Sequence, residues 1–95
     1  MYAIQDTEDF ETVLSLSFPK QDVLVTETDR QKRKANLIKA VTLESLAPTE
    51  VVLYLETKEG CQKVKSRVLA TGDQQVLIER GFAVPISSIH RVDFP

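Results

Sequence analysis

Apolar and polar residues alternate along most of the second half of the chain. In Gln62 to Ala70, for example, Val64 lies between Lys63 and Lys65, and Val68 directly follows Arg67. A period of two is typical of a strand with one buried face. Glycine-containing turns break the pattern, and Gly60 fits the left-handed position of a short hairpin turn. The pattern predicts strands at 51–57, 62–70, 75–79, 82–84 and 89–94, turns at 57–60, 71–73 and 80–81, and one helical turn at 85–88.

The first 28 residues have a different pattern. Asp6 begins an acidic stretch in which Phe10, Val13 and Leu14 have i, i+3, i+4 spacing, and Pro19 follows. One apolar stripe behind an acidic first turn predicts a short helix over 6–14, capped by Asp6. Residues 22–28 are rich in β-branched side chains, which predicts a strand.

Residues 29–46 are open to two interpretations. The segment contains no glycine or proline and many good helix formers, and Asp29 is a suitable N-cap. This composition favours a helix. Four cations at its start would face the positive end of the helix dipole, which favours a hairpin with a charged tip instead.

The order of these elements predicts an α+β protein with one domain over residues 1–95. Residues 1–48 would hold one or two short helices, a strand and the ambiguous basic segment, and residues 49–95 the remaining strands. Four or five short strands with turns about every eight to twelve residues predict a small, strongly bent antiparallel barrel. Its expected core is Val51, Leu53, Leu55, Val64, Val68, Val76, Ile78, Val84, Ile86, Ile89 and Val92.

Composition agrees with a soluble globular domain. Of 95 residues, 42% are hydrophobic and 27% charged, which excludes a disordered chain. No apolar run approaches the length of a membrane span, and the acidic start has no apolar signal-peptide region. We therefore expect a cytoplasmic protein without a membrane partner.

The residues from Val51 to Val92 resemble the small SH3-like and Sm-like barrels. In those barrels one 3₁₀ turn separates the last two strands, and Pro85-Ile86-Ser87-Ser88 is placed for that turn. The same half is similar to Rho-binding antiterminator proteins. The resemblance implies a barrel, and its RNA-binding members imply a nucleic-acid partner.

From Ala40 through Phe94 the chain also resembles a family of short bacterial proteins of unknown function. The matching residues are Ala40-x-x-Leu43, Val51 to Gly60, and Gly81 to Phe94. Two positions depart from the family pattern: Leu55 stands where it has phenylalanine, and Glu44-Ser45 where it has Gly-Asn. The resemblance implies a fold and supplies no activity.

Residues suited to catalysis or metal binding are sparse. His90 and Cys61 are each the only residue of their kind, and no spacing joins either one to a nucleophile, base or metal-ligand set. Cys61 follows Gly60, where it would be an ordinary thiol on a turn or a thiol activated by nearby lysines. The three glycines are isolated, which excludes a phosphate-binding loop. We expect no cofactor and no enzymatic activity.

Charge is distributed unevenly. Residues 30–67 carry a net charge of +5 and the rest of the chain −7, for a total of −2. A basic face suits an acidic partner, a second copy of the chain or nucleic acid. We expect a small protein-interaction module with an unidentified protein partner or self-association; the alternative is weak RNA binding. The candidate binding residues are Arg30, Lys32, Arg33, Lys34, Lys63, Lys65 and Arg67.

Overall fold

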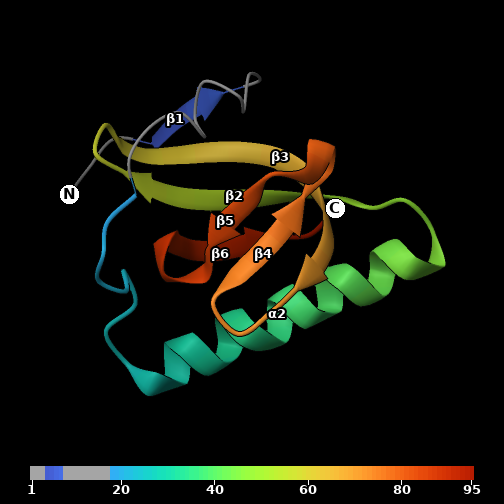
Figure 1. Ribbon diagram of the computed structural model, residues 1–95, viewed down its shortest axis with the longest axis horizontal. Helices are drawn as coiled ribbons and strands as arrows, with labels where there is room; N and C mark the ends of the chain where they lie inside the picture. Colours follow the sequence, from blue (N-terminus) through green and yellow to red (C-terminus); the bar gives the residue numbers. More distant parts are fainter. Residues whose placement is uncertain (1–3, 8–17) are drawn as a thin grey trace.

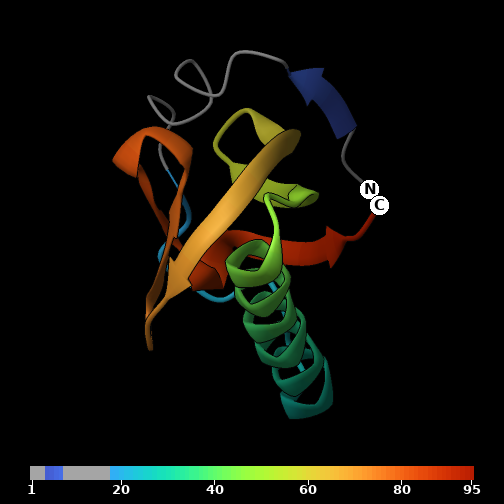
Figure 2. The same ribbon diagram turned by 90° about the vertical axis from the view of Figure 1, so that its right-hand side faces the viewer.

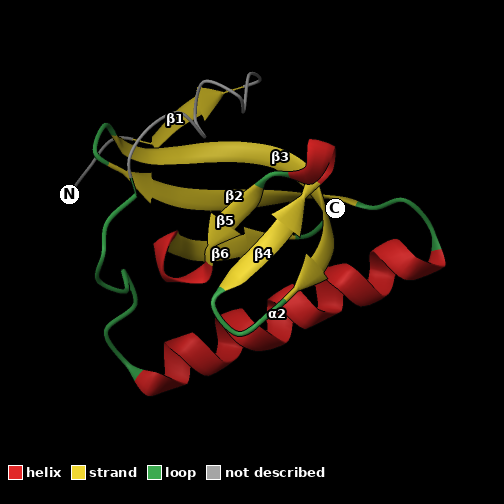
Figure 3. Cartoon of the chain, viewed as in Figure 1, coloured by secondary structure: helices red, strands yellow, loops and turns green. Residues whose placement is uncertain are grey.

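The computed structural model describes residues 4–7 and 18–95, which form one long helix and a curved sheet (Figure 1). The helix precedes strands β2 to β6 in the chain, and Figure 3 shows it in red below the yellow strands. In chain order the elements are β1 (Ile4–Thr7), α2 (Glu27–Leu46), β2 (Glu50–Thr57), β3 (Gly60–Thr71), β4 (Gln75–Ile78), the 3₁₀ turn η1 (Glu79–Gly81), β5 (Ala83–Pro85), the 3₁₀ turn η2 (Ile86–Ser88) and β6 (Ile89–Asp93).

Helix α2 confirms the helical interpretation of residues 29–46, and the hairpin alternative is wrong. The helix begins two residues earlier than predicted because Thr26, not Asp29, caps it: the Thr26 hydroxyl accepts the Asp29 N–H at 3.2 Å. Glu27 and Asp29 lie in its first turn and offset the cations there. Among the described residues, no helix has both the length and the apolarity needed to cross a membrane.

The strand predicted at 22–28 is wrong. This segment has no regular structure before α2 begins, and a side chain and the carbonyl of a distant residue accept its N–H groups in place of a neighbouring strand. The Asp22 carboxylate accepts the Leu24 N–H at 2.8 Å, and the Ser87 carbonyl accepts the Val23 N–H at 2.9 Å. Of the helix predicted over 6–14, Asp6 and Thr7 belong to strand β1, and the remainder lies outside the described residues.

The sheet has five antiparallel strands in the order β5-β4-β3-β2-β6. Strand β3 is its longest member, and it pairs with β2 along its first part and with β4 along its last. Strand β1 adds to β3 in parallel, with Ile4 opposite Cys61 and Thr7 opposite Val64. Lys63 and Val64 therefore have paired strands on both sides.

The predicted barrel is not closed. The α+β class is confirmed, but β5 pairs only with β4 and β6 only with β2 among the described strands, so the sheet stays open. Helix α2 lies along this open side and contacts β3 and β6 (Figure 2). Leu37 and Ala40 of α2 are fully buried in the core that the sheet encloses. In a closed barrel, further strand pairing would close this side of the sheet. Here helix α2 covers it instead.

The predicted core is confirmed at ten of its eleven positions, and Ile86 packs half-buried at its margin. The spacing of Ile89 and Val92 explains one irregularity. Both are buried although they are three residues apart, and this requires the register shift between Tyr54 and Leu55, where Leu55 pairs with Ile89 and Tyr54 with Arg91. His90 lies at this irregularity, between Ile89 and Arg91, and is half-buried.

Candidate protein-interaction surface

The helical cations are partly used to hold the fold together. Arg33 is only 6% exposed and donates two hydrogen bonds to Asp22, at 2.7 and 2.6 Å, and one to the Ile89 carbonyl at 3.1 Å. Arg30 also lies 3.6 Å from Asp22 and donates to the Leu24 carbonyl at 2.9 Å. Two of the four cations predicted at the start of the helix thus form hydrogen bonds with other groups of the same chain.

Hydrogen bonds from Arg33 lower the pKa of Asp22, and they outweigh the opposing effect of burial. The remaining two cations, Lys32 and Lys34, are exposed. Lys32 lines a depression between α2 and β6 whose other charged residues are Arg33, Arg91 and Asp29.

The basic stripe on β3 is formed as predicted, with Lys63, Lys65 and Arg67 on the outer face of the sheet. Its charge is partly compensated. Arg67 donates to Glu44 of α2, through Nε at 2.9 Å, and Glu50 lies directly opposite Arg67 on β2. The hydrogen bond to Glu44 raises the pKa of Arg67 and lowers that of Glu44.

The two groups of cations do not form one surface. Glu44 marks the point where the stripe reaches α2, and it lies eleven residues after Arg33. At 1.5 Å per residue, the helical cluster is about 16 Å away along the helix axis. A single patch extending from Arg30 to Arg67 is therefore absent from the described part of the chain.

Every described aromatic ring is packed or covered. The Arg91 guanidinium lies over the Tyr54 ring at 4.5 Å, and the Lys39 ammonium lies over Phe94 at 4.4 Å. Phe18, Phe82 and Phe94 pack against the core. Single-stranded nucleic acid needs open rings for base stacking.

The residues suited to chemistry are also engaged. His90 Nε2 lies 2.9 Å from the Glu56 carboxylate, and the Ser88 hydroxyl donates to the Pro85 carbonyl at 2.7 Å. Cys61 is buried in β3 rather than placed on the turn, and burial raises the pKa of its thiol. The activated thiol considered from the sequence is therefore wrong. Within residues 4–7 and 18–95, no three His, Cys, Asp or Glu side chains gather as a metal site.

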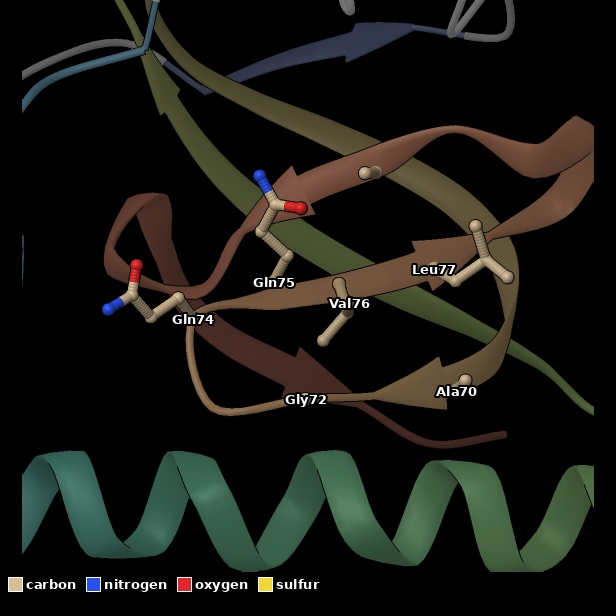
Figure 4. Close-up of a pocket in the computed structure, with 7 residues that line it drawn as sticks. Ala70, Gly72, Gln74, Gln75, Val76 and Leu77 are labelled. Carbon is tan, nitrogen blue, oxygen red and sulfur yellow. The ribbon is translucent and has the colours of Figure 1, made fainter.

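A shallow hollow on the outer face of β3, β4 and β5 is the surface feature that the sequence did not reveal (Figure 4). Its volume is about 610 Å³. Leu77 pairs with Ala70 on one side and with Ala83 on the other, so these three outward residues form a row across the strands. We call this feature the outer hollow; it is lined by Ala70, Gly72, Gln74, Gln75, Val76, Leu77 and Ala83.

The outer hollow contains no ionisable residue, although 27% of the chain is charged. Leu77 is 38% exposed, and Leu69 on the adjacent strand is 39% exposed. Figure 4 shows the side chains of Gln74 and Gln75 near the start of β4, on the opposite side of the hollow from Leu77 and Ala70, where they add amide donors and acceptors. The sequence contained one weak indication of an exposed apolar residue here. Leu77 lies between Val76 and Ile78, which are buried, so a strand places Leu77 on the opposite, outer face.

The edge of the sheet beside the hollow resists strand addition. Ile78 N–H bonds to the Phe82 carbonyl and Ile86 N–H to the Gln74 carbonyl, so alternation turns the backbone of Ala83 and Pro85 away from β4. Proline has no N–H, and its carbonyl already accepts the Ser88 hydroxyl. A partner at this face would therefore bind through side chains.

A second depression lies on the other side of the β3–β4 turn. It has a volume of about 240 Å³ between α2 and the turn, and its apolar residues are Leu37, Ile38 and Ile86. We call it the helix groove. Lys34 and Asp73 also line it, and Gly72 lines both the groove and the outer hollow.

Comparisons of the chain with protein-family models, curated proteins and solved structures found no match.

Proposed function

We propose that this protein is a small, non-enzymatic protein-interaction module that binds an uncharged, apolar segment of a partner protein in the outer hollow. The observation that supports the proposal is the chemistry of the hollow: an exposed row of Ala70, Leu77 and Ala83 with no ionisable residue in its lining. A charged segment would lose hydration there without gaining an ion pair. An apolar side chain would gain by removing Leu77 from water.

The ion pairs of the cations disfavour the alternative function, which is weak RNA binding. Phosphate contacts require clustered, available cations. Arg30, Arg33 and Arg67 already form ion pairs, and Arg91 covers the Tyr54 ring. RNA binding stays a prediction of the family resemblance, as does membership of the family of short bacterial proteins.

The proposal is tested with a random dodecapeptide display library selected against the full chain. We expect enriched peptides to be apolar and uncharged. In a ¹H–¹⁵N NMR titration, they should shift the amides of Ala70, Leu77 and Ala83. Acidic peptides that shift Lys63 and Lys65, or a library without enrichment, would contradict the proposal.

Two matched leucine variants separate binding from folding. Leu77→Ser should lower the affinity for the selected peptide roughly tenfold, because burying a leucine side chain is worth about 1.5–3 kcal/mol. Leu46→Ser is the control, since Leu46 is 80% exposed at the end of α2 and lies outside the hollow. Equal affinities for the two variants would overturn the proposal.

Two further arms test other occupants. Titration with a short mixed-sequence RNA at low salt should produce no shift in the hollow, and saturable RNA binding that survives moderate salt would overturn the proposal in favour of RNA. Sedimentation should show a monomer at the concentrations of the titration. A dimer that Leu77→Ser dissociates would mean that a second copy of the chain, and not a partner, fills the hollow.

A further inference from the structure

The Arg33 side chain keeps one buried N–H group without a partner. Its two terminal nitrogens donate to the Asp22 carboxylate and the Ile89 carbonyl. Its Nε atom is buried and has no hydrogen-bond partner in the part of the chain that the structure describes, although the whole residue is only 6% exposed. Buried donors are nearly always paired, because an unpaired one costs free energy. An acceptor supplied by a ligand would pair it.

Arg33 lines the depression between α2 and β6, which has a volume of about 340 Å³. We call it the basic depression. Lys32 and Asn36 lie one helical turn apart on its α2 side, and Arg91 lines it from β6. The lining thus holds three cations and an amide against a single acid, Asp29. Its size lies within the range of small-molecule sites, which is roughly 300–1,000 Å³.

Two of these cations remain available to a ligand. Lys32 is exposed and forms no ion pair within the described residues. Arg91 pairs with Asp93 at 3.1 Å, but their side chains are 63% and 43% exposed, so water screens this pair and it contributes little. Arg33 is neutralised by Asp22 and offers a donor rather than a charge. The available positive charge therefore exceeds that of the one acid in the lining.

We propose that the basic depression binds one phosphate group, either inorganic phosphate or the phosphate of a small monoester. Arg33 Nε, the Lys32 ammonium and the Asn36 amide donate to its oxygens, and Arg91 adds charge from β6. Phosphate offers at least three acceptor oxygens for these donors, whereas a carboxylate has two. Because Nε itself is covered, the lining moves slightly to admit the oxygen that it bonds.

This site is separate from the outer hollow, so the proposal goes beyond the proposed function. It also differs from RNA binding. One phosphate group needs neither the run of cations nor the open aromatic rings that single-stranded RNA requires.

The proposal is tested by titrating the full chain with sodium phosphate and recording the Nε–Hε groups of arginine by ¹H–¹⁵N NMR. The Arg33 resonance should shift saturably, because its Hε gains an acceptor. Sodium chloride at the same ionic strength should leave it unchanged. An equal shift with chloride, or a Arg33 resonance that phosphate does not move, would overturn the proposal.

Two further ligands define the chemistry of the site. Methyl phosphate should shift the same resonance if the site takes a monoester, and a response to inorganic phosphate alone would assign the site to the free ion. Acetate should bind more weakly than either, since it has two oxygens and one charge. Acetate binding as tightly as phosphate would overturn the choice of phosphate.

Three variants on α2 locate the binding. Lys32→Gln should lower the phosphate affinity about threefold, and Asp29→Asn should raise it about twofold by removing the opposing charge. Lys34→Gln is the matched control, because Lys34 is an exposed cation on the same helix outside the basic depression. Equal losses in Lys32→Gln and Lys34→Gln would mean that phosphate is attracted only to the charge of the segment, which overturns the proposed site.

Discussion

Arg33 and Asp22 form a nearly buried ion pair that fixes the segment before helix α2 against the rest of the domain. Two parallel hydrogen bonds join the guanidinium to the carboxylate, and a third connects the guanidinium to the Ile89 carbonyl of β6. A residue that sequence reasoning assigned to partner binding is therefore a structural link among three parts of the chain. Its geometry is that of a bidentate arginine–carboxylate pair, which lysine could not reproduce.

Replacing Arg33 by methionine should destabilise the protein by roughly 2–4 kcal/mol. The change leaves the Asp22 carboxylate and the Ile89 carbonyl without their hydrogen-bond donor. Because Asp22 retains some contact with solvent, the loss of stability is near or below that of breaking a fully buried pair. Urea unfolding followed by circular dichroism measures it. Arg30→Met, at an exposed cation 3.6 Å from the same carboxylate, should cost less than about 1 kcal/mol. Equal costs would show that the buried geometry is unimportant.

Stability should fall on acidification through the Asp22 carboxylate. Arg33 lowers the pKa of Asp22 in the folded state, so the unfolded chain binds this proton at higher pH. The stabilisation is complete above the ordinary aspartate pKa of about 3.9 and is lost as the pH falls through the lower folded value. Urea midpoints measured across this range should decline less steeply in Asp22→Asn. In Asp22→Asn, the dependence of the urea midpoint on pH that remains comes from Glu44, whose pKa is also lowered.

Leu53→Ala should cost roughly 2–5 kcal/mol, because Leu53 is fully buried at the centre of β2 and the substitution leaves a cavity. Val52, the preceding residue, points to the outer face and is half-buried. Val52→Ala should therefore cost distinctly less in the same denaturant experiment. A reversed order would mean that β2 presents the opposite face to the core.

Cys61 should react slowly with a thiol reagent in the native protein. It is buried in β3, and burial raises the pKa of its thiol, so both access and thiolate content are reduced. Reaction with Ellman's reagent at neutral pH should accelerate strongly in urea. Rapid reaction of the native protein would indicate that the pairing of β1 with β3 at Cys61 opens readily.

Any binding of single-stranded RNA to the stripe should depend weakly on salt. Arg67 is paired with Glu44, so a strand that binds without breaking this pair would contact at most two cations of the stripe, Lys63 and Lys65. Two phosphate contacts give a log–log slope of about −1.4. Filter binding over a series of salt concentrations measures this slope. A slope steeper than about −2 would show that Arg67 leaves Glu44 to bind phosphate.

Local patterns predicted most of the second half of the fold. Strands β2 and β3 and the turn at Gly60 follow from alternation and from glycine's access to positive φ, which are properties of short stretches of chain. The prediction failed at Val23 to Val25, where β-branched composition indicated a strand. The Asp22 carboxylate accepts the Leu24 N–H and the Ser87 carbonyl accepts the Val23 N–H instead, and Arg33 of α2 donates to the same Asp22 carboxylate.

The sequence by itself determined the period-two strands, their buried faces and the helical composition of α2, because neighbouring residues decide these. The tertiary structure alone decided which charges remain available, since Arg33 finds Asp22 eleven residues away and Arg67 finds Glu44 at a separation of 23. It also decided that the sheet stays open under α2, and that Ala70, Leu77 and Ala83 lie in one exposed row. Ion pairing and surface shape depend on residues distant in the chain, and no local pattern records them.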